Sequence, residues 1–235
     1  MIKILISISL FLLPVSSINV SDNVACSSKD SDYSVEHEFL AWSQELLAEI
    51  NEDELEIQVF RLALKGYLKL DDENKIEKPG IISIIDFSKS SNKERLFIVD
   101  IESKKLLFKE LVAHGIKTGV EFAKYFSNTR YSNQSSLGFY VTGRTYSGKN
   151  GFSLKLHGKE NAFNSKAFER GIVVHGASYV SDKFIKKNGR LGRSFGCPAV
   201  PSDKNNTIIN TIKNGTCFFI YYPDEKYLSH SYLID

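Results

Sequence analysis

The chain has 235 residues, of which 42% are hydrophobic and 25% are charged, and this composition excludes a disordered, fibrous or multispanning protein. The length accommodates one sizeable domain with a shorter extension. Lys and Arg number 30 against 28 Asp and Glu, so the net charge of +2 does not indicate a nucleic-acid partner.

The N-terminus has the layout of a secretory signal. Lys3 precedes an apolar run over residues 4–13, and the small residues Ser16 and Ser17 follow. We therefore predict a signal peptide over residues 1–20 and export to the periplasm or cell envelope. The run is shorter than the roughly 20 apolar residues of a membrane-spanning helix. An uncleaved N-terminal anchor is the alternative, and no other stable membrane partner is expected.

Three cysteines are present, and an odd number leaves at least one thiol unpaired in an exported chain. Cys217 lies in the apolar run 216–222, which favours a buried structural residue. Cys26 follows the export segment in a stretch that loosely resembles a lipoprotein acylation site, so it is lipidated, paired or free.

Two amphipathic helices are predicted before residue 75, because apolar residues recur at helical spacing on both sides of the acidic segment 51–54. The first set is Val35, Phe39, Trp42, Leu46 and Ile50, and the second is Leu55, Val59, Leu62, Gly66 and Leu70. Pro79-Gly80 closes the helical part. We predict a helical extension over residues 21–79 and a second domain over residues 80–235.

The second domain is predicted to be mainly β. Short runs rich in strand-forming residues are separated by Gly, Asn, Ser and Asp, and they span residues 81–87, 96–101, 105–112, 152–156, 171–174 and 216–222. Residues 121–149 lack regular periodicity and are rich in Ser, Asn, Tyr and Gly, so we interpret them as loops that cross the sheet. Such loops often carry binding surfaces.

The candidate catalytic residues lie in two stretches, 171–181 and 192–201. The first is predicted to be a strand that ends at His175, and the second is a turn of small residues that presents Cys197. A thiol is mostly protonated at neutral pH, so a nucleophilic cysteine requires a base such as an imidazole. Without a Cβ, Gly196 allows close backbone approach, and the amides around it are candidates for stabilising an oxyanion.

The sequence around His175 and Cys197 resembles the L,D-transpeptidase catalytic domain, also called the YkuD-like domain. The motif of that domain is a His-Gly or His-Ser at a strand end, followed by Ser/Thr-His-Gly-Cys. Here His175-Gly176 and Ser194-Phe195-Gly196-Cys197 take those places. The match looks closest to a divergent branch with Gly-Arg-Ser-x-Gly-Cys-Pro-Ala, and it covers roughly residues 95–222.

The resemblance implies a β-sandwich-like catalytic domain, over residues 80–235, in which the cysteine faces a groove under a loop flap. It implies that Cys197 attacks the carbonyl after the L-centre of diaminopimelate in a peptidoglycan tetrapeptide stem and expels D-alanine. The thioester then passes to an amine acceptor, with His175 acting as base and then as acid. Peptidoglycan stem peptides are the expected partners, and no metal or organic cofactor is expected.

Two positions depart from the family pattern. Phe195 stands where the family has a second histidine, and Ala199 stands where many relatives have Arg or Asn two places after the cysteine. Arg193 and His157 are candidate substitutes in substrate binding. Ser194, which is predicted to hold the imidazole or a substrate group, and Gly176 complete the predicted substrate-binding set.

Three alternatives remain open at this point. Water instead of an amine would make the enzyme an L,D-carboxypeptidase or an endopeptidase. A catalytically silent cell-wall-binding module would contain Cys197 as a buried or disulfide-bonded residue. A zinc site formed by His157, His175 and Cys197 is the third, although these residues lack the short paired spacing common in zinc sites.

Overall fold

The computed structural model describes residues 28–235, with side chains from residue 34 on. The predicted signal peptide and Cys26 lie outside the described residues. The chain divides into two compact units, Met1–His37 and Glu38–Asp235, and the sheet and the candidate site described below lie in the second. Between residues 28 and 235, no helix is both long and apolar enough to cross a membrane.

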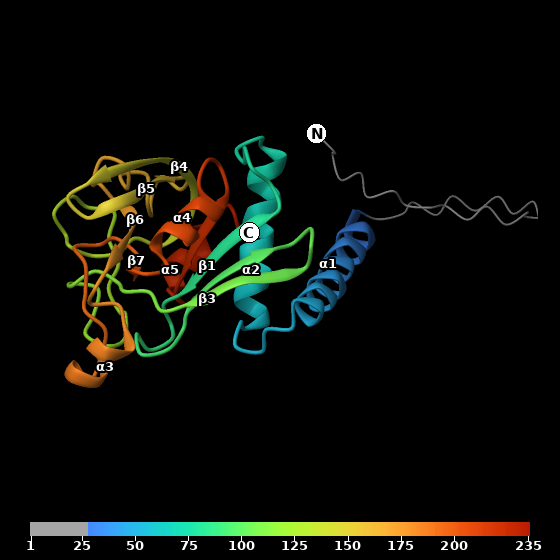
Figure 1. Ribbon diagram of the computed structural model, residues 1–235. Coiled ribbons are helices and arrows are strands. Elements are labelled where there is room, and N and C mark those ends of the chain that lie inside the picture. Colours follow the sequence, from blue (N-terminus) through green and yellow to red (C-terminus); the bar gives the residue numbers. More distant parts are fainter. Residues whose placement is uncertain (1–27) are drawn as a thin grey trace, which may run out of the picture. The chain divides into compact units, whose positions relative to one another are not determined.

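Both predicted N-terminal helices are present, as α1 (Ser28–Ile50) and α2 (Ile57–Asp72). α2 packs on the sheet through one buried face, formed by Val59, Phe60, Ala63, Leu64, Gly66, Tyr67 and Leu70. Gly66 lies so near Phe139 that an added Cβ would fall 2.1 Å from the ring. The absence of a side chain at this position therefore sets how closely α2 approaches the sheet (Figure 1).

Eight strands form one continuous sheet in the order β3-β2-β1-β8-β4-β5-β6-β7 (Figure 1). Their bounds are β1 (Ile81–Asp86), β2 (Leu96–Asp100), β3 (Lys105–Glu110), β4 (Gly138–Gly148), β5 (Gly151–Gly158), β6 (Val173–Ala177), β7 (Ala199–Pro201) and β8 (Cys217–Tyr221). The β1/β8 and β6/β7 pairs are parallel and the others are antiparallel. The mainly β fold class with N-terminal helices is thus confirmed.

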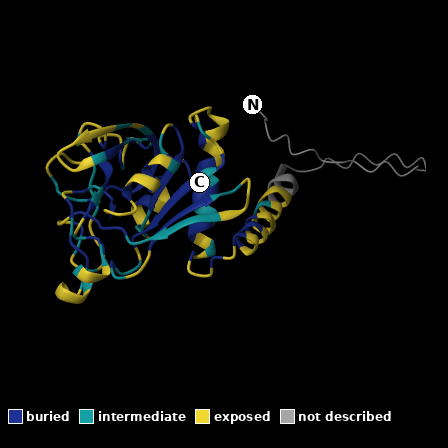
Figure 2. Ribbon diagram, in the orientation of Figure 1, coloured by how far each residue is buried: buried dark blue, intermediate teal, exposed yellow. Residues whose placement is uncertain are grey.

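Three short helices complete the fold: α3 (Asp182–Asn188), α4 (Asn205–Ile212) and α5 (Glu225–His230). α3 has no buried residue, and only Phe184 and Ile185 are partly buried in an otherwise exposed helix (Figure 2). α4 buries Ile208, Ile209 and Ile212 and contacts β5 and β6. It therefore covers one face of the sheet next to the strand that carries His175.

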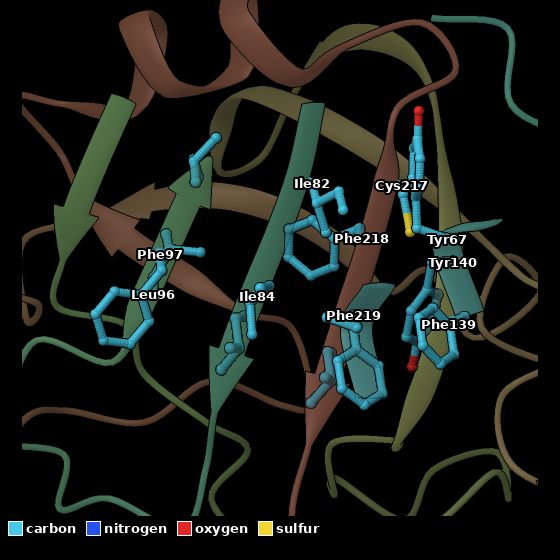
Figure 3. Packing of buried hydrophobic residues seen from close by; sticks show 14 of the residues in the cluster. Tyr67, Ile82, Ile84, Leu96, Phe97, Phe139, Tyr140, Cys217, Phe218 and Phe219 are labelled. Carbon is cyan, nitrogen blue, oxygen red and sulfur yellow. The ribbon is translucent and has the colours of Figure 1, made fainter. Parts of the chain in front are cut away.

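Aromatic side chains fill the core between α2 and the central strands. Phe139 of β4 stacks on Phe219 of β8 with ring centroids 4.1 Å apart, and both are fully buried (Figure 3). Cys217 is also fully buried beside them, as predicted, and its thiol has a pKa raised by burial. The core thus fixes β8 and β4, on which β5 and β6 are built.

Two sequence predictions are wrong in detail. Residues 138–148 form the strand β4, whereas the prediction placed loops over the whole of residues 121–149. β4 pairs with β5 and β8, so distant partners stabilise a segment of weak local pattern. His175 lies in the middle of β6 rather than at a strand end, because β6 continues to Ala177 alongside β7.

Candidate active site

The turn that precedes β7 holds Cys197 in a fixed position. The Ser194 hydroxyl donates to the Cys197 carbonyl at 2.6 Å and accepts from the Gly196 amide at 3.0 Å. Gly196 has a φ of 126°, a conformation that side chains with a Cβ rarely adopt. Ser194 therefore closes the turn. Of its two predicted roles, it does not hold the imidazole, and contact with a substrate group stays a prediction.

A neighbouring segment supports the turn from outside. The Ser135 hydroxyl donates to the Gly196 carbonyl at 3.1 Å. The backbone of Ser194 pairs with the His114 carbonyl at 3.0 Å and with the Ile116 amide at 2.7 Å. The turn is thus hydrogen-bonded on both sides before any substrate binds, which is the preorganisation that an acyl-transfer site requires.

The sulfur of Cys197 lies at the edge of β6. The Val173 amide donates to Sγ at 3.5 Å, and Sγ lies 3.6 Å from the Gly171 carbonyl. Burial raises the pKa of the Cys197 thiol, while the Val173 amide and the positive charge of Arg170 oppose that rise. The residue is only partly buried, so a substrate can reach it.

His175 is directly opposite Ala199 in the parallel pair of β6 and β7. Ala199 follows Cys197 by two residues in the sequence. The Nδ1 atom of His175 lies 3.0 Å from the Gly176 carbonyl, and because a carbonyl only accepts, Nδ1 carries the proton. No group in residues 34–235 hydrogen-bonds to Nε2, which leaves this atom available as a base. The side chain is 5% exposed, and burial lowers its pKa.

The directions of the Cys197 and His175 pKa shifts indicate the protonation state of the site before substrate binds. A raised pKa keeps the thiol protonated at neutral pH, and a lowered pKa keeps the imidazole neutral. The arrangement therefore suits a base that accepts the thiol proton as the sulfur attacks. It does not favour a preformed pair of thiolate and imidazolium.

The expected oxyanion donors need one correction. The Gly196 amide already donates to Ser194 Oγ, so it is not free to face a substrate oxygen. The Cys197 amide has no acceptor among the residues that the structure describes. Gly196 therefore contributes its backbone shape, and the Cys197 amide is the better candidate donor.

The four predicted substrate-binding residues do not gather at one place. Ser194 and Gly176 lie at the site, where Ser194 closes the turn and the Gly176 carbonyl orients His175. Arg193 donates to the carbonyls of Ile116 and Gly119 at 3.1 and 2.9 Å and so braces a loop. His157 lies on β5 and stacks on Phe168 at 5.1 Å.

The two departures from the family pattern have different outcomes. Phe195 is 76% exposed and projects from the turn, so it is positioned to contact a substrate but not to transfer a proton. Ala199 is fully buried in β7 and cannot replace the substrate contact of a longer side chain. No cluster of three or more metal-binding side chains is present in residues 28–235, including around His157, His175 and Cys197.

Arg170 is the site residue that sequence reasoning missed. It donates to the Gln134 carbonyl at 2.6 Å and to Ser132 Oγ at 3.2 Å, so it ties the loop over Gly196 to the strand entering the site. Its charge favours the Cys197 thiolate and lowers the pKa of that thiol. The sequence feature that could have identified Arg170 is its position as a cation directly before the predicted strand that contains His175.

Gly196→Ala is expected to lower the free energy of unfolding by about 1–3 kcal/mol, the typical cost of a strained backbone conformation. The new Cβ would lie 2.8 Å from the Gln134 carbonyl, in addition to the strain at φ 126°. Chemical denaturation measures the loss. Gly151→Ala is the matched control, since its φ is also positive, at 75°, but no atom lies within 4 Å of its Cβ position. Equal losses in the two variants would contradict the packing argument.

Comparison with known protein families identifies the domain. A family model described as the L,D-transpeptidase catalytic domain matches residues 51–221, which is well over half of the chain. The chain belongs to the L,D-transpeptidase catalytic domain family. The resemblance of the His175 and Cys197 stretches is thereby confirmed at the level of the family. The match begins at residue 51, so it includes α2, which the sequence assigned to the helical extension.

Solved L,D-transpeptidases are structural neighbours at low identity. An L,D-transpeptidase from Mycobacterium smegmatis matches with a TM-score of 0.38 and 11% identity over 61% of this chain and 59% of that one. The helical cell shape determining protein Pgp2 from Campylobacter jejuni matches with a TM-score of 0.42 and 13% identity over 68% of this chain and 54% of that one. An L,D-transpeptidase from Stackebrandtia nassauensis matches with a TM-score of 0.37 and 13% identity over 80% of each chain. The chain thus spans less than two thirds of the first two neighbours. Among curated proteins, none matches this sequence.

Proposed function

We propose that this protein is a peptidoglycan L,D-transpeptidase, with Cys197 as nucleophile and His175 as general base and acid. The observation that carries the proposal is the hydrogen-bonded turn that presents Cys197 beside the histidine strand, in a domain of this family. The proposed partners are peptidoglycan stem peptides, and the proposed location is the periplasm or cell envelope.

In the first step, His175 Nε2 takes the Cys197 proton as the sulfur adds to the carbonyl after the L-centre of diaminopimelate. The Cys197 amide faces the resulting oxyanion. The tetrahedral intermediate then collapses, and the imidazolium returns its proton to the departing D-alanine amine. A thioester between Cys197 and the tripeptide remains.

In the second step, an amine of another stem adds to the thioester and gives its proton to His175, and the sulfur leaves as the restored thiol. A water molecule in place of the amine would give a tripeptide, which is the product of an L,D-carboxypeptidase. Hydrolysis after attack on a linkage to the wall would be an endopeptidase reaction. All three share the same acyl-enzyme.

Incubation with a defined disaccharide tetrapeptide, followed by mass analysis of the products, separates these outcomes. The proposal predicts release of D-alanine and formation of a cross-linked dimer. Tripeptide without dimer would assign the hydrolytic activity instead. Binding to peptidoglycan with no D-alanine release would indicate the silent wall-binding module and refute the enzymatic proposal.

A further inference from the structure

A basic cavity of about 680 Å³ lies over β4 and β5, and β5 is the strand that pairs with the histidine strand β6. Its lining includes the cations Lys75, Arg144, Lys155 and Lys159, against a single carboxylate, Glu77. Phe168 forms an aromatic wall, over which the Lys155 ammonium lies 5.0 Å from the ring centroid. We call this the β5 pocket.

The β5 pocket opens on the face of the sheet that carries His175. Lys155 is paired with Val173 and Ser153 with His175 in the antiparallel β5/β6 register. Because side chains alternate along a strand and opposite residues share a face, Lys155 and His175 lie on one face. Their Cα atoms are diagonal neighbours, which are typically about 7–8 Å apart.

The same register connects the pocket to the nucleophile. Lys155 lies opposite Val173, and the Val173 amide donates to Cys197 Sγ. Lys155 and Cys197 therefore lie on opposite sides of β6, so two inter-strand spacings of about 5 Å each separate them. A substrate with its reacting carbonyl at Cys197 would reach the pocket by extending across the face of β6 that carries His175.

The cations in the pocket repel one another in the absence of a ligand. Lys159 is half-buried beside Lys75, and burial together with that charge lowers its pKa. His157 has a pKa lowered by burial and by Lys159 and Lys155. Gly143 leaves room for this imidazole, since an added Cβ would lie 2.5 Å from His157 Nε2. An anionic ligand would relieve this repulsion.

We propose that the β5 pocket binds a carboxylate of the peptidoglycan stem, namely the free carboxylate of the diaminopimelate side chain of the acyl donor. This inference rests on the proposed function, because it names the part of the same substrate that lies beyond the reacting carbonyl. Lys155 and Lys159 are the cations that face the carboxylate, and Phe168 packs against the aliphatic part of the side chain.

The test compares two donor tetrapeptides that differ only in this carboxylate, which is free in one and amidated in the other. Binding to the Cys197→Ala protein is measured by calorimetry, so that no chemistry intervenes. The free-acid donor is expected to bind roughly tenfold more tightly, a gain typical of a charge-assisted contact in a partly buried site. Equal affinities for the two donors would overturn the proposal.

Single substitutions test whether Lys155 and Lys159 are the cations that bind the carboxylate. In the otherwise unchanged enzyme, Lys155→Gln and Lys159→Gln should each raise KM for the free-acid donor several-fold and leave the amidated donor unaffected, with kcat little changed. Lys187→Gln on the exposed helix α3 is the matched control and should change neither. Equal effects of Lys155→Gln and Lys187→Gln would also refute the proposal. Absence of D-alanine release from both donors would instead refute the proposed function.

Discussion

Cys197→Ala is expected to abolish release of D-alanine from a tetrapeptide donor, while the variant folds as stably as the unchanged protein. The sulfur forms the covalent bond in the proposed mechanism, and no described side chain at the turn offers another nucleophile at its position. Ser194 is the nearest hydroxyl in the turn, but it is engaged with the Cys197 carbonyl and the Gly196 amide. Turnover assays and a thermal melt measure the two properties.

Cys217→Ser provides the contrast, because it alters a cysteine that the mechanism does not use. Cys217 is fully buried in β8, so a hydroxyl there is expected to cost roughly 1–3 kcal/mol of unfolding free energy if it finds no partner. Its kcat should stay near that of the unchanged protein below the melting temperature. Substantial turnover in Cys197→Ala, or loss of turnover in folded Cys217→Ser, would show that Cys197 is not the nucleophile.

His175→Gln is expected to lower kcat by about a hundredfold to ten-thousandfold, the usual contribution of a general acid and base. Glutamine retains a polar group near the Gly176 carbonyl but cannot take the thiol proton. Alkylation of Cys197 by iodoacetamide should change far less, because the Val173 amide and Arg170 are the groups that lower the thiol pKa in the resting protein. Turnover within a few-fold of the unchanged enzyme would show that another group is the base.

The dependence of kcat/KM on pH follows from the same pKa directions. Burial lowers the pKa of His175 below its ordinary value of 6.5, so the neutral base persists at pH 6.5 and the acid limb should lie below that pH. Conversely, the rate of Cys197 alkylation should rise up to and beyond pH 9, because the thiol pKa is raised. An acid limb above pH 6.5 would contradict the lowered histidine pKa.

The sequence predicted the helices and most strands because their apolar periodicity is local. β4 was missed since its second half, residues 143–148, has no buried residue, and pairing with β5 stabilises that half, while β8 pairs with the first half. β7 has only three residues, too few for a periodic signal. Its pairing with β6 lengthens the histidine strand past His175.

The strand and turn of the candidate site were predictable from the sequence, but the residues that support them were not. As predicted, His175 lies in a strand and Cys197 lies in a turn, and this turn leads into β7, which pairs with the histidine strand. The contacts of Arg170 and Ser135 join segments more than 30 residues apart in the sequence, so no local pattern reports them. The hydrogen bond from the Gly196 amide to Ser194 likewise depends on turn geometry that composition does not specify.

Covalent catalysis by Cys197 is tested most directly by intact-mass analysis after the protein is mixed with a tetrapeptide donor and quenched in acid. We expect a mass increase equal to the donor less D-alanine, mapped by peptide analysis to the fragment that contains Cys197. The adduct should be absent from Cys197→Ala and present in Cys217→Ser. An adduct mapped to Cys217 or Cys26, or D-alanine release without any Cys197 adduct in rapidly quenched samples, would contradict covalent catalysis by Cys197.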